Sequence, residues 1–279
     1  GGHRQRQGNK RHGGGGRMKP LRAISVAIAM TVLVACASSS SSGTAGSANP
    51  GGELTVFAAS SLTTAFNQIG TDFEAANPGT TVTFNYGSST DLAAQVASEG
   101  TADVFASASA TAMDTVAKDP GVRDRTDFAT NQLVIITPTD DPAGVSTLQD
   151  LTKPGVQLVL GAEGVPVGDY ARQMLDENKL TDEVMPNVVS NEPDDASVVA
   201  KVQAGEADAG IVYTSDIENN AGVRGVSIPT TQNVIATYPI AVVTGSAHTD
   251  LAASFVDYVA GSQGEATLQQ DGFGPPPSG

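Results

Sequence analysis

The sequence predicts an α/β fold in two lobes, and two observations lead to this prediction. Short apolar runs alternate along the chain with amphipathic helical patterns, as in strand–helix–strand units around a sheet. Two segments, residues 130–133 and 236–239, stand at the beginning and the end of a second series of such units. We therefore expect both segments to cross between lobes. The first lobe would comprise residues 53–131 and 237–273, and the second lobe residues 132–236.

The segment before the first strand is expected to lie outside the fold. Residues 1–17 are interpreted as upstream sequence. Residues 18–35 combine a basic start with an apolar run that is too short to span a bilayer but right for a signal peptide. The run ends at Cys36 in the sequence LVAC, which resembles the lipobox of bacterial lipoproteins; the alternative is an ordinary cleavage site with an incidental cysteine. Residues 36–52, rich in Ser, Gly and Ala, are expected to form a flexible tether.

Apolar periodicity predicts the elements of the first lobe. A buried strand at residues 53–58 precedes a helix on which Leu62, Phe66 and Phe73 recur at helical spacing. Residues 77–79 (NPG) form a stop and a turn. The elements expected after this turn are a strand at 81–86, a helix around 92–97, a strand at 102–106 and a helix at 110–117.

The same alternation continues through the second lobe. Residues 132–137 form an apolar run that Pro138 closes, and Pro166 opens a helix at 167–175. The other expected strands lie at 157–160, 187–190, 209–213, 223–228 and 237–243, with helices at 198–202 and 251–259 and a last helix reaching Gln270. Residues 274–279 contain a run of prolines and are expected to be a disordered tail.

Charge and cysteine usage exclude several classes of function. The formal net charge is −15, and 7 of the 15 basic residues precede Cys36 whereas no acidic residue does. The remainder of the chain therefore has 8 basic and 30 acidic residues, a balance of −22. Such an acidic body argues against nucleic acid or an anionic membrane surface as a partner. Because the chain has a single cysteine, no disulfide can form within it.

Catalytic residue combinations are poorly supported by the sequence. His3 and His12 precede the signal segment, which leaves His248 in a polar turn before a helix. Without a second histidine or a free thiol, a nucleophilic triad has no base. The sequence also lacks the nucleophile elbow, the zinc-protease motif, the P-loop and the dinucleotide fingerprint. We therefore expect a protein that is not an enzyme, needs no cofactor and binds no free metal cation.

Pairs of serines follow the first two predicted strands. Residues 56–62 (VFAASSL) and 86–92 (YGSSTDL) each run from an apolar strand through two serines into a helical pattern. A helix N-terminus has unpaired N–H groups and a partial positive charge, which together favour an anion. The alternative is that each serine is only a helix cap. Two such junctions at the carboxyl ends of neighbouring strands favour a ligand site.

Four motifs together resemble the molybdate-binding proteins of ABC importers. They are residues 56–62 (VFAASSL), 87–93 (GSSTDLA), 165–171 (VPVGDYA) and 205–213 (GEADAGIVY). The similarity extends in register from Glu53 to Phe273. It implies the two-lobed, type II periplasmic-binding-protein fold, in which each lobe is a central mixed sheet flanked by helices and the two crossing segments form a hinge.

The resemblance also implies a place and a partner. We expect an extracytoplasmic receptor, held by a lipid on Cys36 to the outer face of the cytoplasmic membrane. It would deliver molybdate, and tungstate as well, to an ABC permease, and it would act as a monomer.

The family holds its dianion by hydrogen bonds alone, without a countercharge. Carried over to this sequence, the resemblance assigns the hydroxyl and the backbone N–H of Ser61 and of Ser89 to the ligand. It adds the backbone N–H of Val167 and the phenolic O–H of Tyr213, which would otherwise be interpreted as a half-buried core tyrosine. The last donor is the backbone N–H of Asp195. The family has an apolar residue at this position, so we expect the carboxylate to point away from the anion.

A site made only of donors suits a fully deprotonated oxyanion. Phosphate is partly protonated at neutral pH, and its unpaired proton would cost about 1–3 kcal/mol there. Because no lysine or arginine lies near the proposed ligands in the sequence, backbone dipoles would hold the charge. The choice between molybdate and sulfate depends on cavity size, so a receptor for sulfate or another tetrahedral oxyanion is the alternative. A serine hydrolase using Ser61 or Ser89 is a third hypothesis, and it lacks a base.

Overall fold

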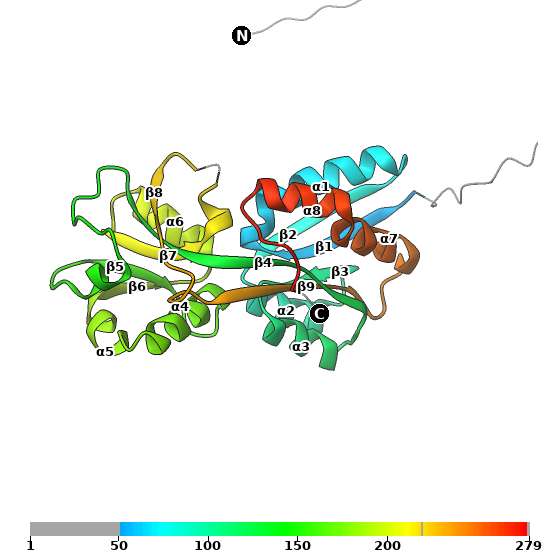
Figure 1. Ribbon diagram of the computed structural model, residues 1–279. Helices are drawn as coiled ribbons and strands as arrows, with labels where there is room; N and C mark the ends of the chain where they lie inside the picture. The colour runs from blue at the N-terminus through cyan, green and yellow to red at the C-terminus, as the bar shows by residue number, and fades with distance from the viewer. Residues whose placement is uncertain (1–50, 219, 278–279) are drawn as a thin grey trace, which may run out of the picture. The chain divides into compact units, whose positions relative to one another are not determined.

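A mixed β-sheet of nine strands runs through the part of the chain that the computed structural model describes, residues 51–218 and 220–277 (Figure 1). The strands are β1 Glu53–Ala59, β2 Thr81–Gly87, β3 Val104–Ala106, β4 Val122–Pro138, β5 Leu158–Gly161, β6 Val188–Glu192, β7 Ala209–Tyr213, β8 Val223–Ser227 and β9 Ile235–Val243. The predicted upstream segment, the signal peptide, Cys36 and nearly all of the tether lie outside the described residues.

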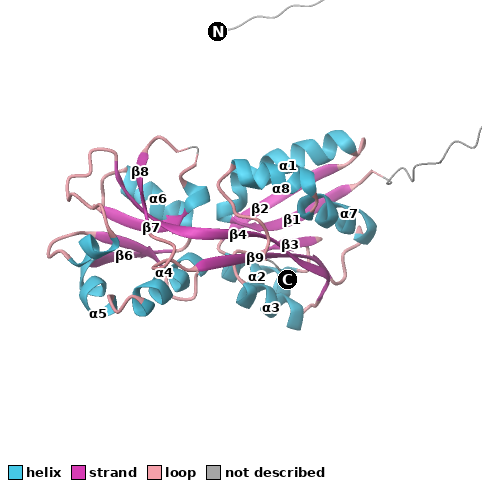
Figure 2. Ribbon diagram, viewed as in Figure 1, coloured by secondary structure: helices cyan, strands magenta, loops and turns pink. Residues whose placement is uncertain are grey.

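Helices connect these strands and cover both faces of the sheet (Figure 2). The α-helices are α1 Thr63–Ala76, α2 Ser89–Glu99, α3 Ala110–Lys118, α4 Pro166–Glu177, α5 Thr181–Val184, α6 Asp195–Gln203, α7 Thr249–Ala260 and α8 Ser262–Gln270. Short 3-10 helices are η1 Ser60–Leu62, η2 Leu148–Thr152, η3 Met185–Asn187 and η4 Thr214–Asp216. Across the described ranges, no helix is both long enough and apolar enough to cross a bilayer.

The strand order shows two parallel groups joined by antiparallel strands. The order is β2-β1-β3-β9-β4-β7-β5-β6, with β8 also paired to β4. β1 is parallel to β2 and β3, and β5 is parallel to β6 and β7, whereas β4 and β9 are antiparallel to their neighbours. The predicted α/β class with mixed sheets is therefore confirmed. Each parallel group forms the core of one lobe, and β4 and β9 connect the two.

β4 passes from one group of strands to the other. Its first part pairs with β9 up to Gln132, which lies opposite Ile235. From Leu133, which lies opposite Tyr213, it pairs with β7 and then β8 instead. The change of partner therefore falls between residues 132 and 133, within the first crossing segment that the sequence indicated. The predicted residue limits of the two lobes stay a prediction.

Aromatic side chains fill the first lobe between the sheet and the helices α1, α7 and α8. Phe73 and Phe255 meet edge to face with ring centroids 5.2 Å apart, and Phe66 packs against both Phe84 and Phe255. Such pairs contribute about 0.5–1.5 kcal/mol beyond the area that they bury. On the other face of the sheet, α2 and α3 pack on a second cluster around Phe105. Figure 2 shows these helices on opposite sides of β1 and β3.

Alternate residues of β7 divide the core of the second lobe. Ile211 belongs to the cluster under α4, whereas Val212 belongs to the cluster under α6, as expected for a strand buried on both faces. Gly210 allows α6 to approach closely, because an added Cβ there would lie 2.8 Å from Val198 Cγ1. This packing fixes where α6 begins relative to the end of β7.

The ordered chain extends beyond the point where the sequence predicted a tail. Gly274 exchanges two backbone hydrogen bonds with Thr130, at 2.8 and 3.1 Å, and the Thr130 hydroxyl donates to the Pro275 carbonyl at 2.8 Å. The segment was expected to be disordered from residue 274 because of its prolines. Its pairing with β4 depends on a tertiary contact, which amino-acid composition does not reveal. Residues 278–279 lie outside the described part.

Candidate anion-binding site

The two serine pairs lie next to each other at the carboxyl ends of neighbouring strands. Ala59 ends β1 and lies opposite Gly87, the last residue of β2, in a parallel register. η1 therefore starts with Ser60 beside the start of α2 at Ser89. Ser88 is the N-cap of α2, and its hydroxyl accepts the backbone N–H of Asp91 at 3.5 Å. The juxtaposition expected from the sequence is thus present, and one serine of the second pair is a cap.

The second lobe brings two more helix starts and one strand end to the same place. α4 begins at Pro166 after β5, α6 begins at Asp195 after β6, and β7 ends at Tyr213. The first backbone bonds inside α4 and α6 come from Asp169 N and Val198 N, so the N–H groups before them have no partner within their own helix. The sum of these dipoles favours a negative ligand.

A small cavity lies where these elements meet. Its volume is about 10 Å³, which is room for roughly one water molecule. Both lobes contribute to its lining, which consists of Ala59, Ser60, Gly87, Ser88, Ser89, Ala108, Val165, Pro166, Val167, Asp195 and Tyr213. The lining contains no lysine, arginine or histidine. Four of the five predicted site residues are therefore brought together here, and the lobes must separate slightly to admit a tetrahedral oxyanion.

Ser60, rather than the predicted Ser61, lines the cavity. The Ser60 hydroxyl donates across the cavity to Asp195 Oδ1, which joins the two lobes. The Ser61 hydroxyl is 2.9 Å from Tyr238 Oη and is buried in the first lobe. Successive side chains of a 3-10 turn point about 120° apart, so the two serines face different surroundings. Nothing in the sequence of a doubled serine shows which of the two faces the cavity.

Ser89 is positioned as a donor. It is buried, and its Oγ accepts the backbone N–H of Ala108 at 2.9 Å. This bond uses a lone pair of the hydroxyl and leaves its proton to be donated elsewhere. No protein acceptor for that proton is found within residues 51–218 and 220–277. A ligand in the cavity would therefore meet a hydroxyl whose orientation is already fixed.

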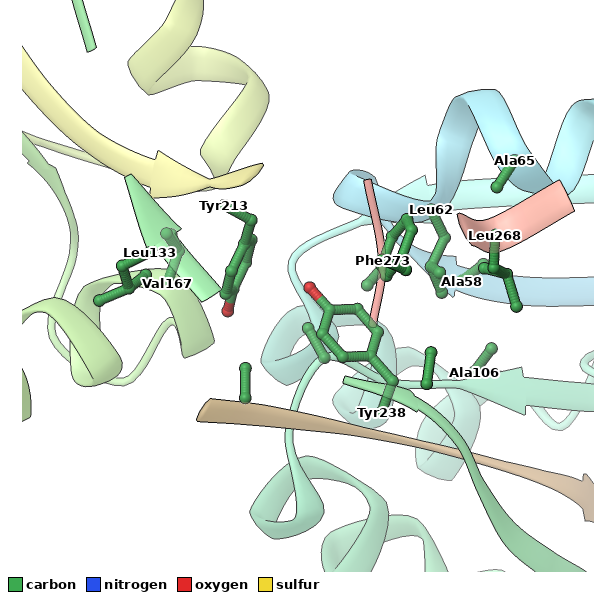
Figure 3. Close-up of a cluster of buried hydrophobic side chains, with 14 of the residues drawn as sticks. Ala58, Leu62, Ala65, Ala106, Leu133, Val167, Tyr213, Tyr238, Leu268 and Phe273 are labelled. Atoms are coloured by element: carbon green, nitrogen blue, oxygen red, sulfur yellow. The ribbon is translucent and has the colours of Figure 1, made fainter. Parts of the chain in front are cut away.

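The Tyr213 hydroxyl is a buried polar group without a hydrogen-bond partner among the described residues. Its ring is 1% exposed, yet its Oη has no hydrogen-bond partner in the part of the chain that the structure describes. Burial raises the pKa of this phenol well above its ordinary value of 10.0, so the group keeps its proton. Figure 3 shows Tyr213 beside Val167, with the hydroxyl of Tyr238 directed toward it. An orphaned buried hydroxyl indicates a ligand that accepts its proton.

The start of α4 is held against the end of β5 by two glycines. A Cβ on Gly168 would lie 2.2 Å from the Ala162 carbonyl oxygen, and a Cβ on Gly161 would lie 2.6 Å from Val167 Cγ1. Only glycine at both positions permits this approach. It brings Val167, whose backbone N–H has no partner within α4, to the lining of the cavity. The bond from this N–H to a ligand stays a prediction.

Asp195 departs from the expectation for its side chain. The carboxylate was expected to point away, but Asp195 is buried, lines the cavity and accepts the Ser60 hydroxyl. Its pKa is raised by burial, and it contacts the carboxyl of Asp216, whose pKa is also raised by burial and by repulsion from Asp195. Asp216 gave no signal in the sequence, because it lies in a 3-10 turn after β7 that no periodicity marks.

A larger cavity of about 540 Å³ lies between α2, α3 and α4 and does not fit the same role. Two of its polar side chains are already committed to bonds within the protein. Thr90 donates to the Gly164 carbonyl at 2.5 Å, and Ser109 caps α3 by accepting Ala112 N at 3.1 Å. The small cavity, where donors without partners converge, is therefore the better candidate. No group of three His, Cys, Asp or Glu side chains suited to a metal ion occurs among the described residues.

Two α/β lobes that meet at a donor-lined cavity define a two-lobed binding protein. Residues 54–274 match the family described as bacterial extracellular solute-binding protein, and the chain belongs to that family. The family is one of binding proteins rather than enzymes, and it acts outside the cytoplasm. The expectation of an extracytoplasmic, non-enzymatic protein is therefore confirmed.

Known relatives agree with this assignment. The molybdate-binding protein ModA of Mycobacterium tuberculosis is 40% identical over 247 residues, which cover 88% of this chain and 93% of that protein. A periplasmic molybdate-binding protein of Azotobacter vinelandii has a TM-score of 0.70 at 20% identity, covering 80% of this chain and all of that one. The sulfate-binding protein SubI of M. tuberculosis also has a TM-score of 0.70, at 18% identity, with 80% and 86% covered. At these identities the two solved structures show the fold alone.

Proposed function

We propose that this protein captures molybdate, and tungstate as well, between its two lobes and delivers it to an ABC permease. The observation that carries the proposal is the cavity itself, where three α-helix starts, a buried serine and the unpartnered Tyr213 hydroxyl converge without any basic side chain. The relative that shares 40% identity bears the name of a molybdate-binding protein. The fold supports a receptor but does not choose the anion, because a sulfate-binding protein shares it.

The proposed ligand set combines donors from both lobes. The first lobe contributes Ser89 and the serine pair, with Ser60 at the cavity and Ser61 behind it. The second contributes the Val167 and Asp195 backbone N–H groups and the Tyr213 hydroxyl. In a cavity closed from water, each of these hydrogen bonds to a dianion counts for more than it would at the surface. A single chain supplies the complete set, which is consistent with a monomer.

Titration calorimetry with molybdate, tungstate, sulfate and phosphate tests this proposal. We expect tight binding of molybdate and tungstate. Phosphate should bind much more weakly, because its proton would find only donors in the cavity and no acceptor. The double variant Ser60→Ala, Ser89→Ala should lose both tight ligands. Sulfate binding as tightly as molybdate would contradict the proposal and favour the alternative, a receptor for sulfate.

Attachment to the membrane is part of the same proposal. Cys36 would carry a lipid after removal of residues 18–35, and residues 36–52 would link it to the folded part. Metabolic labelling with a fatty-acid analogue should mark the wild-type protein and leave Cys36→Ser unmarked. Equal release of both forms into the medium would argue against the anchor.

A further inference from the structure

Two buried polar atoms at the cavity have no donor or acceptor to satisfy them. Asp195 is 5% exposed, and its Oδ1 accepts the Ser60 hydroxyl. Its Oδ2 finds no N–H or O–H donor within residues 51–218 and 220–277, and Tyr213 Oη is equally without a partner there. Both residues line the cavity. Two such atoms at one cavity indicate a ligand that bonds to both.

A second carboxyl group stands behind Asp195. Asp216 Oδ2 accepts the backbone N–H of Tyr213 at 2.8 Å, which holds this side chain at the end of β7. The carboxyl of Asp216 neighbours that of Asp195, and each of them affects the pKa of the other. Two neighbouring buried carboxylates repel each other, which favours a proton on one of them. Burial and the neighbouring Asp195 raise the pKa of Asp216 well above its ordinary value, which favours the protonated form of Asp216.

The surroundings of the pair are acidic or neutral. The titratable groups that act on the two carboxyls are Asp194, Tyr213 and Tyr238. Asp194 is committed to capping α6, where its Oδ1 accepts Ser197 N at 2.7 Å. The basic residues on α6 and on the elements packed against it are engaged elsewhere. Lys201 pairs with Glu192, and Arg224 pairs with Asp141, each at 2.9 Å. On β4, Arg125 pairs with Asp114 at 2.6 Å, and Arg123 donates to the Thr249 hydroxyl at 3.0 Å. No positive side chain therefore offsets the charge of Asp195.

This charge conflicts with the proposed ligand. With one shared proton, the pair carries one negative charge in the free protein. A dianion entering the cavity would meet that charge within contact distance in a dry site, where repulsion is strong. The bond from Ser60 to Asp195 must also open, because the cavity of about 10 Å³ has no room for a tetrahedral oxyanion beside it. One proton taken up from solvent would remove both obstacles.

We propose that Asp195 takes up a proton when the oxyanion binds, so that its carboxyl meets the anion as a neutral O–H donor while Asp216 keeps the other proton. This inference rests on the proposed function. The backbone N–H of Asp195 and its side-chain O–H then face the ligand together with the Tyr213 hydroxyl. Oxyanion capture is thereby coupled to the uptake of about one proton, and affinity falls as pH rises.

The test is calorimetric titration of molybdate into the full chain between about pH 6 and pH 9, in buffers of different ionisation enthalpy. The wild type should take up about one proton per anion, and its dissociation constant should rise up to tenfold per pH unit in the upper part of this range. Asp195→Asn, which offers an N–H donor without a titrating group, should bind with no proton uptake and nearly independently of pH. At the highest pH it should bind more tightly than the wild type.

Two comparisons make the result decisive. Asp182→Asn removes an exposed carboxyl on α5 and should behave as the wild type does. Proton uptake that persists in Asp195→Asn would place the proton on the anion and overturn the inference. Tight binding by the wild type without proton uptake would also overturn it and leave the proposed function intact. Absence of molybdate binding in every variant at every pH would instead refute the proposed function.

If Asp195→Asn does not fold, Asp216→Asn and the wild type still decide the question. Asp216→Asn replaces a neutral carboxyl by a neutral amide, so Asp195 should still take up about one proton per anion. Its proton uptake and pH profile should therefore match those of the wild type. Loss of proton uptake in Asp216→Asn would place the titrating proton on Asp216 and overturn the assignment to Asp195.

Discussion

At the scale of single residues, the site is marked by polar groups whose bonding is incomplete. Most buried polar atoms in a folded protein have a partner. Here the Tyr213 hydroxyl and one Asp195 oxygen have none among the described residues, while Ser89 is held by a bond that leaves its proton available. These atoms converge on one cavity from both lobes. Their incomplete bonding is the physical signature of a ligand site.

Tyr213→Phe separates the ligand bond from the packing of the ring. Because the hydroxyl has no protein partner in the described chain, the variant should keep the thermal stability of the wild type or gain slightly. Molybdate affinity should fall by about tenfold through the loss of one donor. Calorimetry and thermal unfolding measure the two effects.

The matched control is Tyr86→Phe, which removes a hydroxyl that donates to Asn67 Oδ1 at 3.0 Å outside the cavity. Its molybdate affinity should equal that of the wild type. Equal affinity in Tyr213→Phe as well would show that the tyrosine belongs to the core alone.

Asp216 makes the stability of the ligand-free protein depend on pH. Its folded-state pKa is raised by burial and by Asp195, so the folded state binds more protons than the unfolded state above the ordinary value of 3.8. The contribution is therefore favourable in acid and is lost as pH rises through the raised folded pKa. We expect the melting temperature of Asp216→Asn to increase relative to the wild type as pH rises from about 5 to 8. Parallel melting curves for the two proteins, with Asp182→Asn as the control, would count against this.

At the scale of elements, the position of each helix start matters more than its sequence. α4 brings Val167 to the cavity because Gly161 and Gly168 let the helix pack directly against β5. α6 presents Asp195 because Asp194 caps it and Val198 packs over Gly210. A shift of either helix by an ångström would move a donor away from the cavity, since hydrogen bonds weaken steeply with distance and angle.

Gly168→Ala tests this dependence. The new Cβ would lie 2.2 Å from the Ala162 carbonyl oxygen, so α4 must move away from β5. We expect a loss of about 1–3 kcal/mol in the free energy of unfolding. Molybdate binding should weaken beyond what the stability loss explains, because the Val167 N–H moves with the helix.

Gly52→Ala is the control for that variant. Its added Cβ would meet only ordinary contacts, the nearest atom being His248 Nδ1 at 3.6 Å. Chemical denaturation and calorimetry should show both properties unchanged in the control. A Gly168→Ala protein with wild-type affinity would show that molybdate binding does not require the close packing of α4 against β5.

At the scale of the whole molecule, two hydrogen bonds join the lobes directly. Thr90 on α2 donates to the Gly164 carbonyl before α4 at 2.5 Å, and Ser60 donates to Asp195. β4 and β9 connect the lobes through paired, continuous strands rather than loose linkers. A hinge of this kind allows the lobes to separate and to close again on a ligand.

Thr90→Ala should shift this equilibrium toward the open form. Loss of one hydrogen bond that exists only when the lobes meet should weaken molybdate binding by about fivefold, mainly through faster dissociation. Stopped-flow release kinetics measure this, and Thr71→Ala, which removes a hydroxyl bonded to Asn67 O within α1, is the control. Small-angle scattering of the wild type should show contraction when molybdate is added. Identical scattering profiles would contradict closure.

Much of the fold could be predicted from the sequence because apolar periodicity is a local property. The strands β1, β2 and β7, and the helices α1 and α2 that follow the first two of them, lie where the patterns indicated. β4 was predicted only from residue 132, although it begins at Val122. Its first half carries charged side chains and two register shifts, so the periodicity that identifies a strand is interrupted there.

The sequence by itself determined the alternation of strands and helices, the serine junctions and, through four motifs, the family. Each of these depends on residues close together in the chain. Only the tertiary structure decided that Ser60 faces the cavity, and that Asp195 meets Asp216 and points inward. The first fact depends on which side chain of the 3-10 turn η1 faces the second lobe. The second depends on contacts between residues far apart in sequence. Side-chain direction and proton sharing arise from packing, and packing has no local signature in the chain.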